Sequence, residues 1–337
     1  MFVLGIQGSP RKNGNADFLL TSFLKACEDF GARTEVIRPE DLDIQPCKEL
    51  IVCEKKGFCP LKDQMETGGY RKVKQADVVV LASPVFFYNV TAQVKVFIDR
   101  CQMFWGRKYK LKLKDPHAHY RQGFLLSVAA SRGKRLFEGV ELTAKYFFDA
   151  ISADYAGSLT YKQVEDAGDI IVRPELEKEI QDAVAHLLSP LRDNKRVIFV
   201  SQKGCRSLMA SAFAKEDFKG RINVLAARLA PRLAPGLEPV EKPDALMLRA
   251  MAQIDLDLKY QSALVLDDLL VNEGLNGQRD QVVFLGSDQE MKQIPPLPGE
   301  IRSRTLTIPL PGKGDLESYE LLRNEISRQV NWLLPTL

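Results

Sequence analysis

The sequence is poor in cysteine and in net charge, and each shortage excludes a class of protein. With 6 Cys among 337 residues, the chain does not resemble a secreted framework of disulfides. The 47 Lys and Arg residues nearly balance the 44 Asp and Glu residues, which leaves a formal charge of +3. So small an excess does not favour binding to nucleic acid or to an acidic membrane. Any bound anion must therefore be held by a local site.

Long apolar runs are also missing. The first residues, MFVLGIQGSP, lack the basic and apolar regions of a signal peptide. No uncharged run approaches the ~18 apolar residues of a membrane span. We therefore expect a cytoplasmic protein with no membrane partner and no nucleic-acid partner.

Length and composition predict two domains. At roughly 150 residues per domain, a chain of 337 residues has room for two, and its 45% hydrophobic content gives each half a core. The residues Ser189 and Pro190, followed by the charged run 192–196, indicate a boundary. We predict one domain over residues 1–190 and a smaller one over residues 195–337.

The first half alternates apolar strands with amphipathic helices. Strands are expected at residues 2–6, 34–37, 76–82 and 124–130. Helices are expected from Asn15 onward, where Leu19, Leu20, Phe23, Leu24 and Cys27 share one face, and at residues 92–101, 142–151 and 175–188. Continuous apolar strands of this kind are covered on both faces, as in parallel sheets. The pattern predicts an α/β fold with a doubly wound parallel sheet.

The second half restarts the same pattern. A strand at 197–201 leads through a loop into a helix that begins near Ser207. Further strands are expected at 222–227, 282–286 and 305–308, a proline-rich loop at 231–243, and a helix at 244–254. The last helix carries one apolar stripe, made of Leu316, Tyr319, Leu322, Ile326, Val330 and Leu333. This half is therefore a second α/β domain.

The first chemical motif is Gly8-Ser-Pro-Arg-Lys-Asn-Gly-Asn15, between a strand and a helix. Backbone N–H groups and the positive end of a helix dipole converge there, which suits a phosphate. Ser9 and Asn15 can donate hydrogen bonds, and Arg11 adds charge. The alternative is an ordinary loop with Asn15 as N-cap. Neither a Walker loop nor a GxGxxG loop is present, so a monophosphate such as that of FMN fits better than a triphosphate.

The second motif, SPVFFYN at residues 83–89, follows the strand ADVVVLA. In open parallel sheets, ligands bind where such strand ends meet. Exposed amides and aromatic side chains at this place suit a flat ring. Core packing is the alternative for Phe86 and Phe87, but together with the phosphate loop the motif favours a flavin.

Three stretches in this order, GSPRKNGNAD, SPVFFYNVTAQVKVFIDR and SVAASRGKRLFEG, resemble the NAD(P)H-dependent FMN reductase family, in its iron–sulfur flavoprotein-like branch. The resemblance covers residues 1 to about 188. It implies a flavodoxin-like fold, FMN as cofactor, NAD(P)H as reductant and a homo-oligomer. Hydride transfer to the flavin would be followed by electron delivery to an unknown small molecule or protein.

The resemblance also implies the residues of the FMN site, and it implies no catalytic side chain, because FMN carries the chemistry. The phosphate would lie at Ser9, Arg11, Asn13, Asn15 and Ala16. The isoalloxazine would lie beside Pro84, Val85, Phe86, Phe87 and Asn89, with the loop of Ala130, Ser131, Arg132 and Gly133 close to it.

Three of the six cysteines are clustered at Cys47, Cys53 and Cys59. The iron–sulfur branch has a C-x2-C-x2-C motif followed by a fourth cysteine, and Leu50 stands at the second ligand position here. A [4Fe–4S] cluster ordinarily takes four thiolates, and zinc would also need a fourth donor. We therefore favour metal-free thiols, with these three cysteines as the ligands of a cluster only in the less favoured alternative.

The second half is similar to the low-molecular-weight tyrosine phosphatase and arsenate reductase family over residues 195–337. That family has a C-x5-R loop, in which a thiolate attacks while the arginine holds the oxyanion. Counting back from Arg206, the nucleophile position holds Val200. The late Asp-Pro general acid is replaced by Leu310-Pro311. We therefore predict a catalytically inactive domain.

Two details of this loop stay open at the level of sequence. Cys205 matches a second, non-nucleophilic cysteine of some family members, and packing or a modest redox role would explain it. Arg206 and the neighbouring amides are either an anion site or a structural remnant.

Three functions remain. We favour an FMN-dependent NAD(P)H oxidoreductase with a degenerate phosphatase-like domain. The first alternative is an FMN-binding electron-transfer or redox-sensing protein that does not use nicotinamide. The second is anion binding, or residual phosphatase or arsenate reductase activity, in the C-terminal domain.

Overall fold

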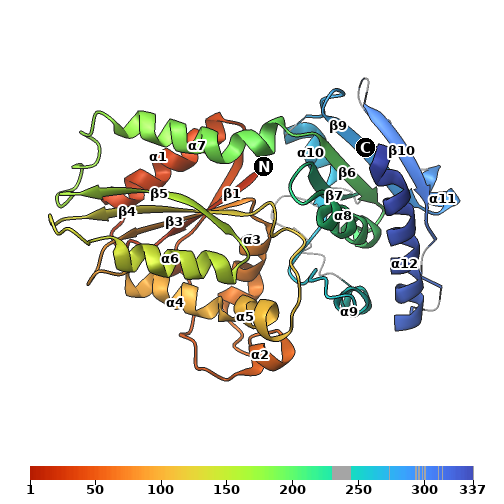
Figure 1. The fold of residues 1–337 in the computed structure, drawn as a ribbon, viewed down its shortest axis with the longest axis horizontal. Helices are drawn as coiled ribbons and strands as arrows, with labels where there is room; N and C mark the ends of the chain where they lie inside the picture. The colour runs from red at the N-terminus through yellow and green to blue at the C-terminus, as the bar shows by residue number, and fades with distance from the viewer. Residues whose placement is uncertain are drawn as a thin grey trace. The chain divides into compact units, whose positions relative to one another are not determined.

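The chain divides into two compact units in this computed structural model (Figure 1). Unit 1 comprises Met1–Lys112 and Tyr120–Arg192, and unit 2 comprises Leu113–His119 and Asp193–Leu337. The structure describes residues 1–229, 244–272, 274–292, 294, 297, 299, 301–309, 311–312 and 314–336.

Unit 1 is built on a parallel five-stranded sheet with the order β2-β1-β3-β4-β5. Its strands are β1 (Phe2–Gln7), β2 (Arg33–Ile37), β3 (Val78–Pro84), β4 (Gln122–Ala129) and β5 (Asp154–Lys162). The strands β1 and β3 are almost wholly buried, as their continuous apolar sequences predict. The doubly wound α/β fold is confirmed, and this unit is flavodoxin-like.

Helices cover both faces of the first sheet (Figure 1). The helices α1 (Asn15–Asp29) and α7 (Leu176–Asp193) pack on one face, and α4 (Ala92–Arg100) and α6 (Glu138–Ala150) pack on the other. The predicted stripe of α1 is buried and joins the core with β1, β3, β4 and α7. Shorter helical elements are η1 (Pro39–Asp41), α2 (Val52–Lys56), η2 (Met65–Gly69), α3 (Tyr70–Gln75), α5 (Gln102–Trp105) and η3 (Gly106–Lys110).

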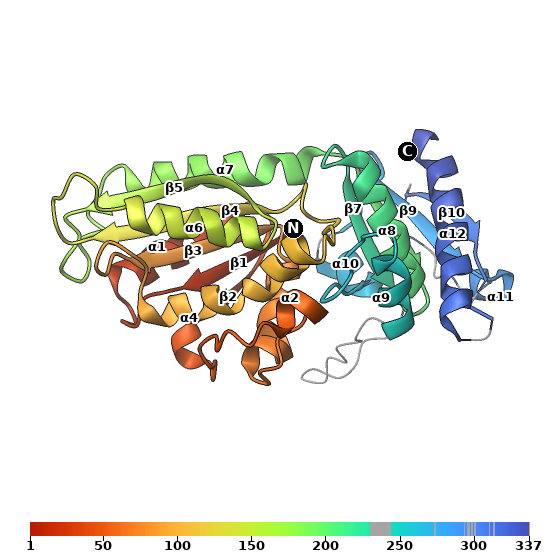
Figure 2. The same ribbon diagram turned by 60° about the horizontal axis from the view of Figure 1, so that its bottom comes forward.

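Unit 2 has its own parallel five-stranded sheet, with the order β10-β9-β6-β7-β8. The strands are β6 (Arg196–Ser201), β7 (Asn223–Arg228), β8 (Leu264–Val265), β9 (Asp280–Gly286) and β10 (Arg302–Thr307). The helices are α8 (Cys205–Phe218), α9 (Ala245–Ala252), α10 (Leu266–Asn272), α11 (Asp288–Met291), α12 (Leu316–Leu333) and the short η4 (Leu334–Thr336). Figure 2 shows α12 alongside α8, and the apolar stripe of α12 forms one core with α8 and α9.

The structure differs from the sequence prediction in three places. The helix expected at 175–188 continues through Pro190 and ends, as α7, at Asp193. A proline so near the end removes a single hydrogen bond of the helix. The helix expected from Ser207 begins at Cys205. The strand β5 was not predicted, because it lies at the sheet edge, where most of its residues are half-buried and polar residues interrupt the apolar ones. The proline-rich segment 231–243 lies outside the described residues.

In the part of the chain that the structure describes, no helix combines the length and the apolar character that crossing a membrane requires.

Candidate functional site

The three predicted flavin loops follow three neighbouring strands at one edge of the first sheet. The register pairs Gln7 at the end of β1 with Ala82 of β3, and it pairs Pro84 at the end of β3 with Val128 of β4. The strand order reverses direction between β1 and β3. In open α/β sheets this switch point is where ligands bind.

The first loop is fixed to β3 through Gly8. Its N–H donates to the carbonyl of Ala82 at 2.6 Å, and a Cβ at Gly8 would lie 2.8 Å from that same oxygen. The hydroxyl of Thr91 donates to the Gly8 carbonyl. Only a glycine allows this approach, so the loop starts at a fixed place beside the end of β3.

The start of α1 lacks a side-chain cap. Its N-cap is Gly14, which has no side chain to accept from the N–H groups of the first turn. The first N–H groups of a helix have no partner inside it, and they carry the positive end of the helix dipole. Ser9 is half-buried, whereas Arg11 and Asn13 are exposed. This end of the sheet therefore offers an anion the N–H groups at the start of α1 and two exposed cations, Arg11 and Lys12.

Residues that were not among the predicted site residues hold this loop in place. Asp17, in the first turn of α1, accepts hydrogen bonds from the backbone N–H of Asn13 at 2.9 Å, from Gln7 at 3.0 Å and from Arg38 at 2.6 Å. Burial would raise the pKa of Asp17, but these hydrogen bonds outweigh it and the pKa is lowered. The ion pair with Arg38 offsets the negative charge that Asp17 brings close to an anion site. The signal in the sequence that could have identified Asp17 is its place in the first turn of the predicted helix, where an acidic side chain is favourable.

Asn15 makes different contacts from those expected. Its side-chain amide donates to the carbonyl of Asp166 at 2.8 Å and accepts from the N–H groups of Gly168 and Ile170 at 3.0 and 3.4 Å. It is the first residue of α1 and not the N-cap. In this structure Asn15 therefore ties the loop after β5 to the start of α1, and the backbone there is left for an anion.

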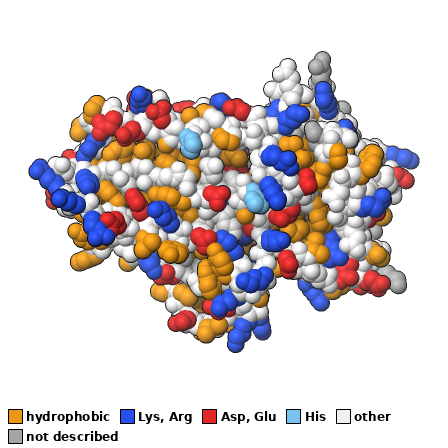
Figure 3. Space-filling model, in the orientation of Figure 1, with side chains coloured by type: hydrophobic (Ala, Val, Ile, Leu, Met, Phe, Trp, Pro, Cys, Tyr) orange, Lys and Arg blue, Asp and Glu red, His pale blue; other side chains and the backbone are white. Residues whose placement is uncertain are grey.

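The second and third loops pack against each other. Leu136 and Phe137, which follow the third loop, form a small buried cluster with Ala129, and Val85 packs against it. The N–H of Val85 also donates to the Val128 carbonyl at 3.0 Å. Ala130 and Ser131, at the start of the third loop, are exposed. Figure 3 shows Lys and Arg side chains gathered over this end of unit 1.

The aromatic residues of the second loop are not core residues. Phe86 is 50% exposed, Phe87 is fully exposed and Tyr88 is 56% exposed. The packing alternative for Phe86 and Phe87 is therefore wrong. Exposed aromatic side chains beside an uncapped helix start fit a ligand with a flat ring and an anionic tail. The residues present at this edge fit FMN.

The cysteine segment does not fit a four-thiolate cluster. Leu50, at the second ligand position, is 51% exposed. Burial raises the pKa of Cys53, and the neighbouring Cys59 and Cys47 raise it further, so the three thiols share one neighbourhood. Among the described residues, which include these cysteines, no three Cys, His, Asp or Glu side chains are placed to hold a metal ion.

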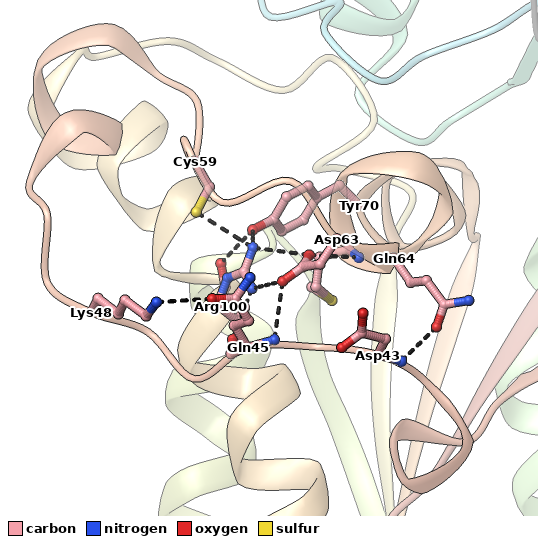
Figure 4. A network of polar contacts seen from close by, with 9 residues as sticks. Asp43, Gln45, Lys48, Cys59, Asp63, Gln64, Tyr70 and Arg100 are labelled. Carbon is pink, nitrogen blue, oxygen red and sulfur yellow. Dashed lines mark hydrogen bonds and ion pairs between the residues drawn. The ribbon is translucent and has the colours of Figure 1, made fainter.

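A buried ion pair holds both ends of this segment in place (Figure 4). Arg100 and Asp63 are paired through both guanidinium Nη atoms, and their side chains are 0% and 1% exposed. Arg100 also donates to the carbonyl of Gln45 at 2.8 Å and contacts the sulfur of Cys59 at 3.5 Å. Protein contacts alone therefore fasten the chain just before Cys47 and just after Cys59.

In unit 2 the arginine at the start of α8 already has an anionic partner. Arg206 is buried, donates to the Ile308 carbonyl at 2.8 Å and pairs with Glu290 at 2.6 Å. The N–H of Ser207 donates to the hydroxyl oxygen of Ser201, and the Ser201 hydroxyl donates to the hydroxyl oxygen of Ser207, at 3.1 Å in both contacts. These contacts favour the structural explanation of Arg206 over an open anion site. Cys205 is half-buried and packs against the core, and the predicted acid position, Leu310, lies outside the described residues.

Comparison with known proteins agrees with the geometry of unit 1. Residues 1–151 match the family described as NADPH-dependent FMN reductase. An iron–sulfur flavoprotein of Archaeoglobus fulgidus is 42% identical over 114 residues, which are 34% of this chain and 51% of that protein. An iron–sulfur flavoprotein of Methanocaldococcus jannaschii is 40% identical over 100 residues, which are 30% of this chain and 51% of that protein. The chain spans about half the length of these curated relatives.

Among solved structures, an arsenate reductase in the oxidized state is 24% identical, with a TM-score of 0.32. The match covers 42% of this chain and 98% of that chain. A likeness at this level supports no conclusion about function.

Proposed function

We propose that the protein is an FMN-dependent oxidoreductase that takes hydride from NAD(P)H and passes electrons to an acceptor still to be identified. The observation that carries the proposal is the strand order β2-β1-β3-β4-β5, with an uncapped helix start and an exposed aromatic turn at its switch point. This order is the flavodoxin-like one that binds FMN at the β1/β3 edge. The family match over residues 1–151 supports it.

Each part of the edge has a role in this proposal. The N–H groups at the start of α1, with Ser9 and Arg11, would hold the phosphate. The turn at 86–89 and the loop at 130–133 would contact the ring. When bound, FMN supplies the two-electron chemistry, and the side chains of this protein supply orientation and exclusion of water. No general acid or base is needed from the chain.

The test is anaerobic reduction of the FMN-loaded full chain. We expect NADPH or NADH to bleach the flavin absorbance in the visible range and reoxidation to restore it. Bound flavin that neither nucleotide bleaches would contradict the nicotinamide step and would favour the alternative of an electron-transfer protein. The expected homo-oligomer and the small-molecule or protein acceptor stay predictions.

A further inference from the structure

The turn at residues 86–89, in the proposed flavin site, has a backbone conformation that bulky residues such as Phe and Tyr disfavour. Phe86 and Asn89 exchange two backbone hydrogen bonds, at 2.8 and 2.9 Å, which closes a two-residue turn. The residues inside it, Phe87 and Tyr88, have φ values of +49° and +61°. Such turns ordinarily use Asn-Gly or Asp-Gly, because positive φ is strained for bulky side chains. Some contact outside the turn must therefore hold it.

The helix α6 provides that contact. A Cβ added at Gly139 would lie 2.0 Å from the carbonyl oxygen of Tyr88, so the backbone of the turn rests directly on this glycine. One helical turn later, the hydroxyl of Thr143 donates to the side-chain oxygen of Asn89 at 2.9 Å. Positions four apart lie on the same helix face. Both contacts therefore act on the same side of the turn.

Tyr88 also reaches the third loop. Its hydroxyl lies 3.5 Å from the position that a Cβ of Gly133 would take. The turn is thus held between α6 and the 130–133 loop, while Phe87 stays fully exposed. Burial of Phe87 does not compensate for its strain, and strained residues that are held by their surroundings concentrate at binding sites.

We propose that Gly139 and Thr143 are positioning residues for the flavin ring, because they set the turn against which the ring lies. Neither is among the residues predicted to contact FMN; Gly139 is the last residue of the third motif, and Thr143 lies beyond it. The proposal rests on the proposed FMN site, and it adds that α6, which contributes no residue to the predicted contacts with FMN, determines the geometry on one side of the ring.

The test compares four variants of the full chain: Gly139→Ala, Thr143→Val, Thr143→Ser and Leu142→Ala. Leu142 lies on the same helix and is 57% exposed, so it controls for changes to α6 in general. Each variant is titrated with FMN by flavin fluorescence, and its bound-flavin absorption spectrum is recorded. Alanine forms helix better than glycine, so a purely helical role for Gly139 would leave FMN binding intact and raise the melting temperature.

We expect Gly139→Ala to raise the dissociation constant of FMN at least about tenfold, which is ~1.4 kcal/mol, and to shift the flavin absorption band. Thr143→Val should show a smaller change in the same direction, whereas Thr143→Ser and Leu142→Ala should match the unmodified chain. An FMN dissociation constant and spectrum of Gly139→Ala equal to those of the unmodified chain would overturn the proposal.

Chymotrypsin, which cleaves after aromatic residues, separates this proposal from the FMN site itself. Without flavin, Gly139→Ala should be cut after Phe87 or Tyr88 faster than Leu142→Ala, as read by mass spectrometry of the fragments. Equal cleavage rates would show that α6 does not hold the turn. Failure of the unmodified chain to bind FMN would instead overturn the proposed function and, with it, the role of this turn.

Discussion

The buried pair of Arg100 and Asp63 offers a sharp energetic test of how the cysteine segment is held. Asp63 accepts from Arg100 and also from the backbone N–H groups of Gln45 and Met65, at 3.1 Å in both contacts. Replacing Arg100 by Met keeps an apolar stem but removes the cation. Asp63 would then be a buried carboxylate without its counter-charge.

Removing one partner of a buried ion pair costs about 3–5 kcal/mol, and we expect Arg100→Met to lower the free energy of unfolding of unit 1 by that amount. The matched control is Asp99→Asn on the same helix. Asp99 pairs with Lys95 at the surface, where both side chains are more than 40% exposed. A surface pair is worth roughly 0.2–1 kcal/mol.

The assay is guanidinium unfolding followed by circular dichroism, with amide hydrogen exchange of residues 45–63 as a local probe. Two units can unfold separately, so the hydrogen exchange assigns the loss to this segment. Protection of residues 45–63 should fall in Arg100→Met and stay unchanged in Asp99→Asn. A loss of less than about 1 kcal/mol, the range of a surface pair, would refute the reasoning.

The pair also predicts a dependence on pH. Burial would raise the pKa of Asp63, but the hydrogen bonds from Arg100 and the backbone outweigh it and the pKa is lowered. A lowered pKa in the folded state means that the stabilisation is complete above the unfolded value of about 3.9. This stabilisation is lost as the pH falls through the lower pKa that Asp63 has in the folded state. The difference in the free energy of unfolding between Arg100→Met and the unmodified chain should therefore narrow in strong acid.

Two further predictions concern the cores of the two units. Gly123→Ala should lower the stability of unit 1 by about 1–3 kcal/mol in a thermal melt, because the added Cβ would lie 2.3 Å from the ring of Phe148; an unchanged melt would contradict this packing. Glu290→Gln should destabilise unit 2 by about 1–3 kcal/mol, because Arg206 loses its anionic partner. Burial would raise the pKa of Glu290, but the hydrogen bonds from Arg206 and Ser287 outweigh it and the pKa is lowered. The destabilisation by Glu290→Gln should therefore be complete above about pH 4.3 and shrink toward lower pH. A destabilisation that grows in acid would contradict the ion pair.

Much of the fold could be predicted because it depends on local patterns. The buried runs of β1 and β3 and the stripe of α1 appear directly in the sequence. The edge strand β5 could not be predicted in this way, because its residues are mostly half-buried and polar ones interrupt any apolar run. The continuation of α7 past Pro190 depends on how little a proline costs near a helix end.

The candidate site, like the fold, could be predicted from the sequence only in part. Its loops are contiguous motifs at strand ends, and the structure places them at one edge. The contacts that hold them are not contiguous: Asp17 with Arg38, and Gly139 with Tyr88, meet only after folding. A single sequence carries no signal for such pairs beyond residue type. The same holds for Arg206, whose partner Glu290 lies 84 positions away.

The central claim is that the edge between β1 and β3 binds FMN by its phosphate. The most direct measurement is titration of the full chain with FMN, followed by flavin fluorescence, for the unmodified protein, Arg11→Ala and the control Lys25→Ala. Lys25 lies on α1 and pairs only at the surface, with Asp29. A charge-assisted hydrogen bond is worth about 1.5–3 kcal/mol, so Arg11→Ala should bind FMN about tenfold to a hundredfold more weakly, and Lys25→Ala should bind it as the unmodified chain does, with one FMN per chain. Absence of FMN binding, or equal affinity in both variants, would contradict the account.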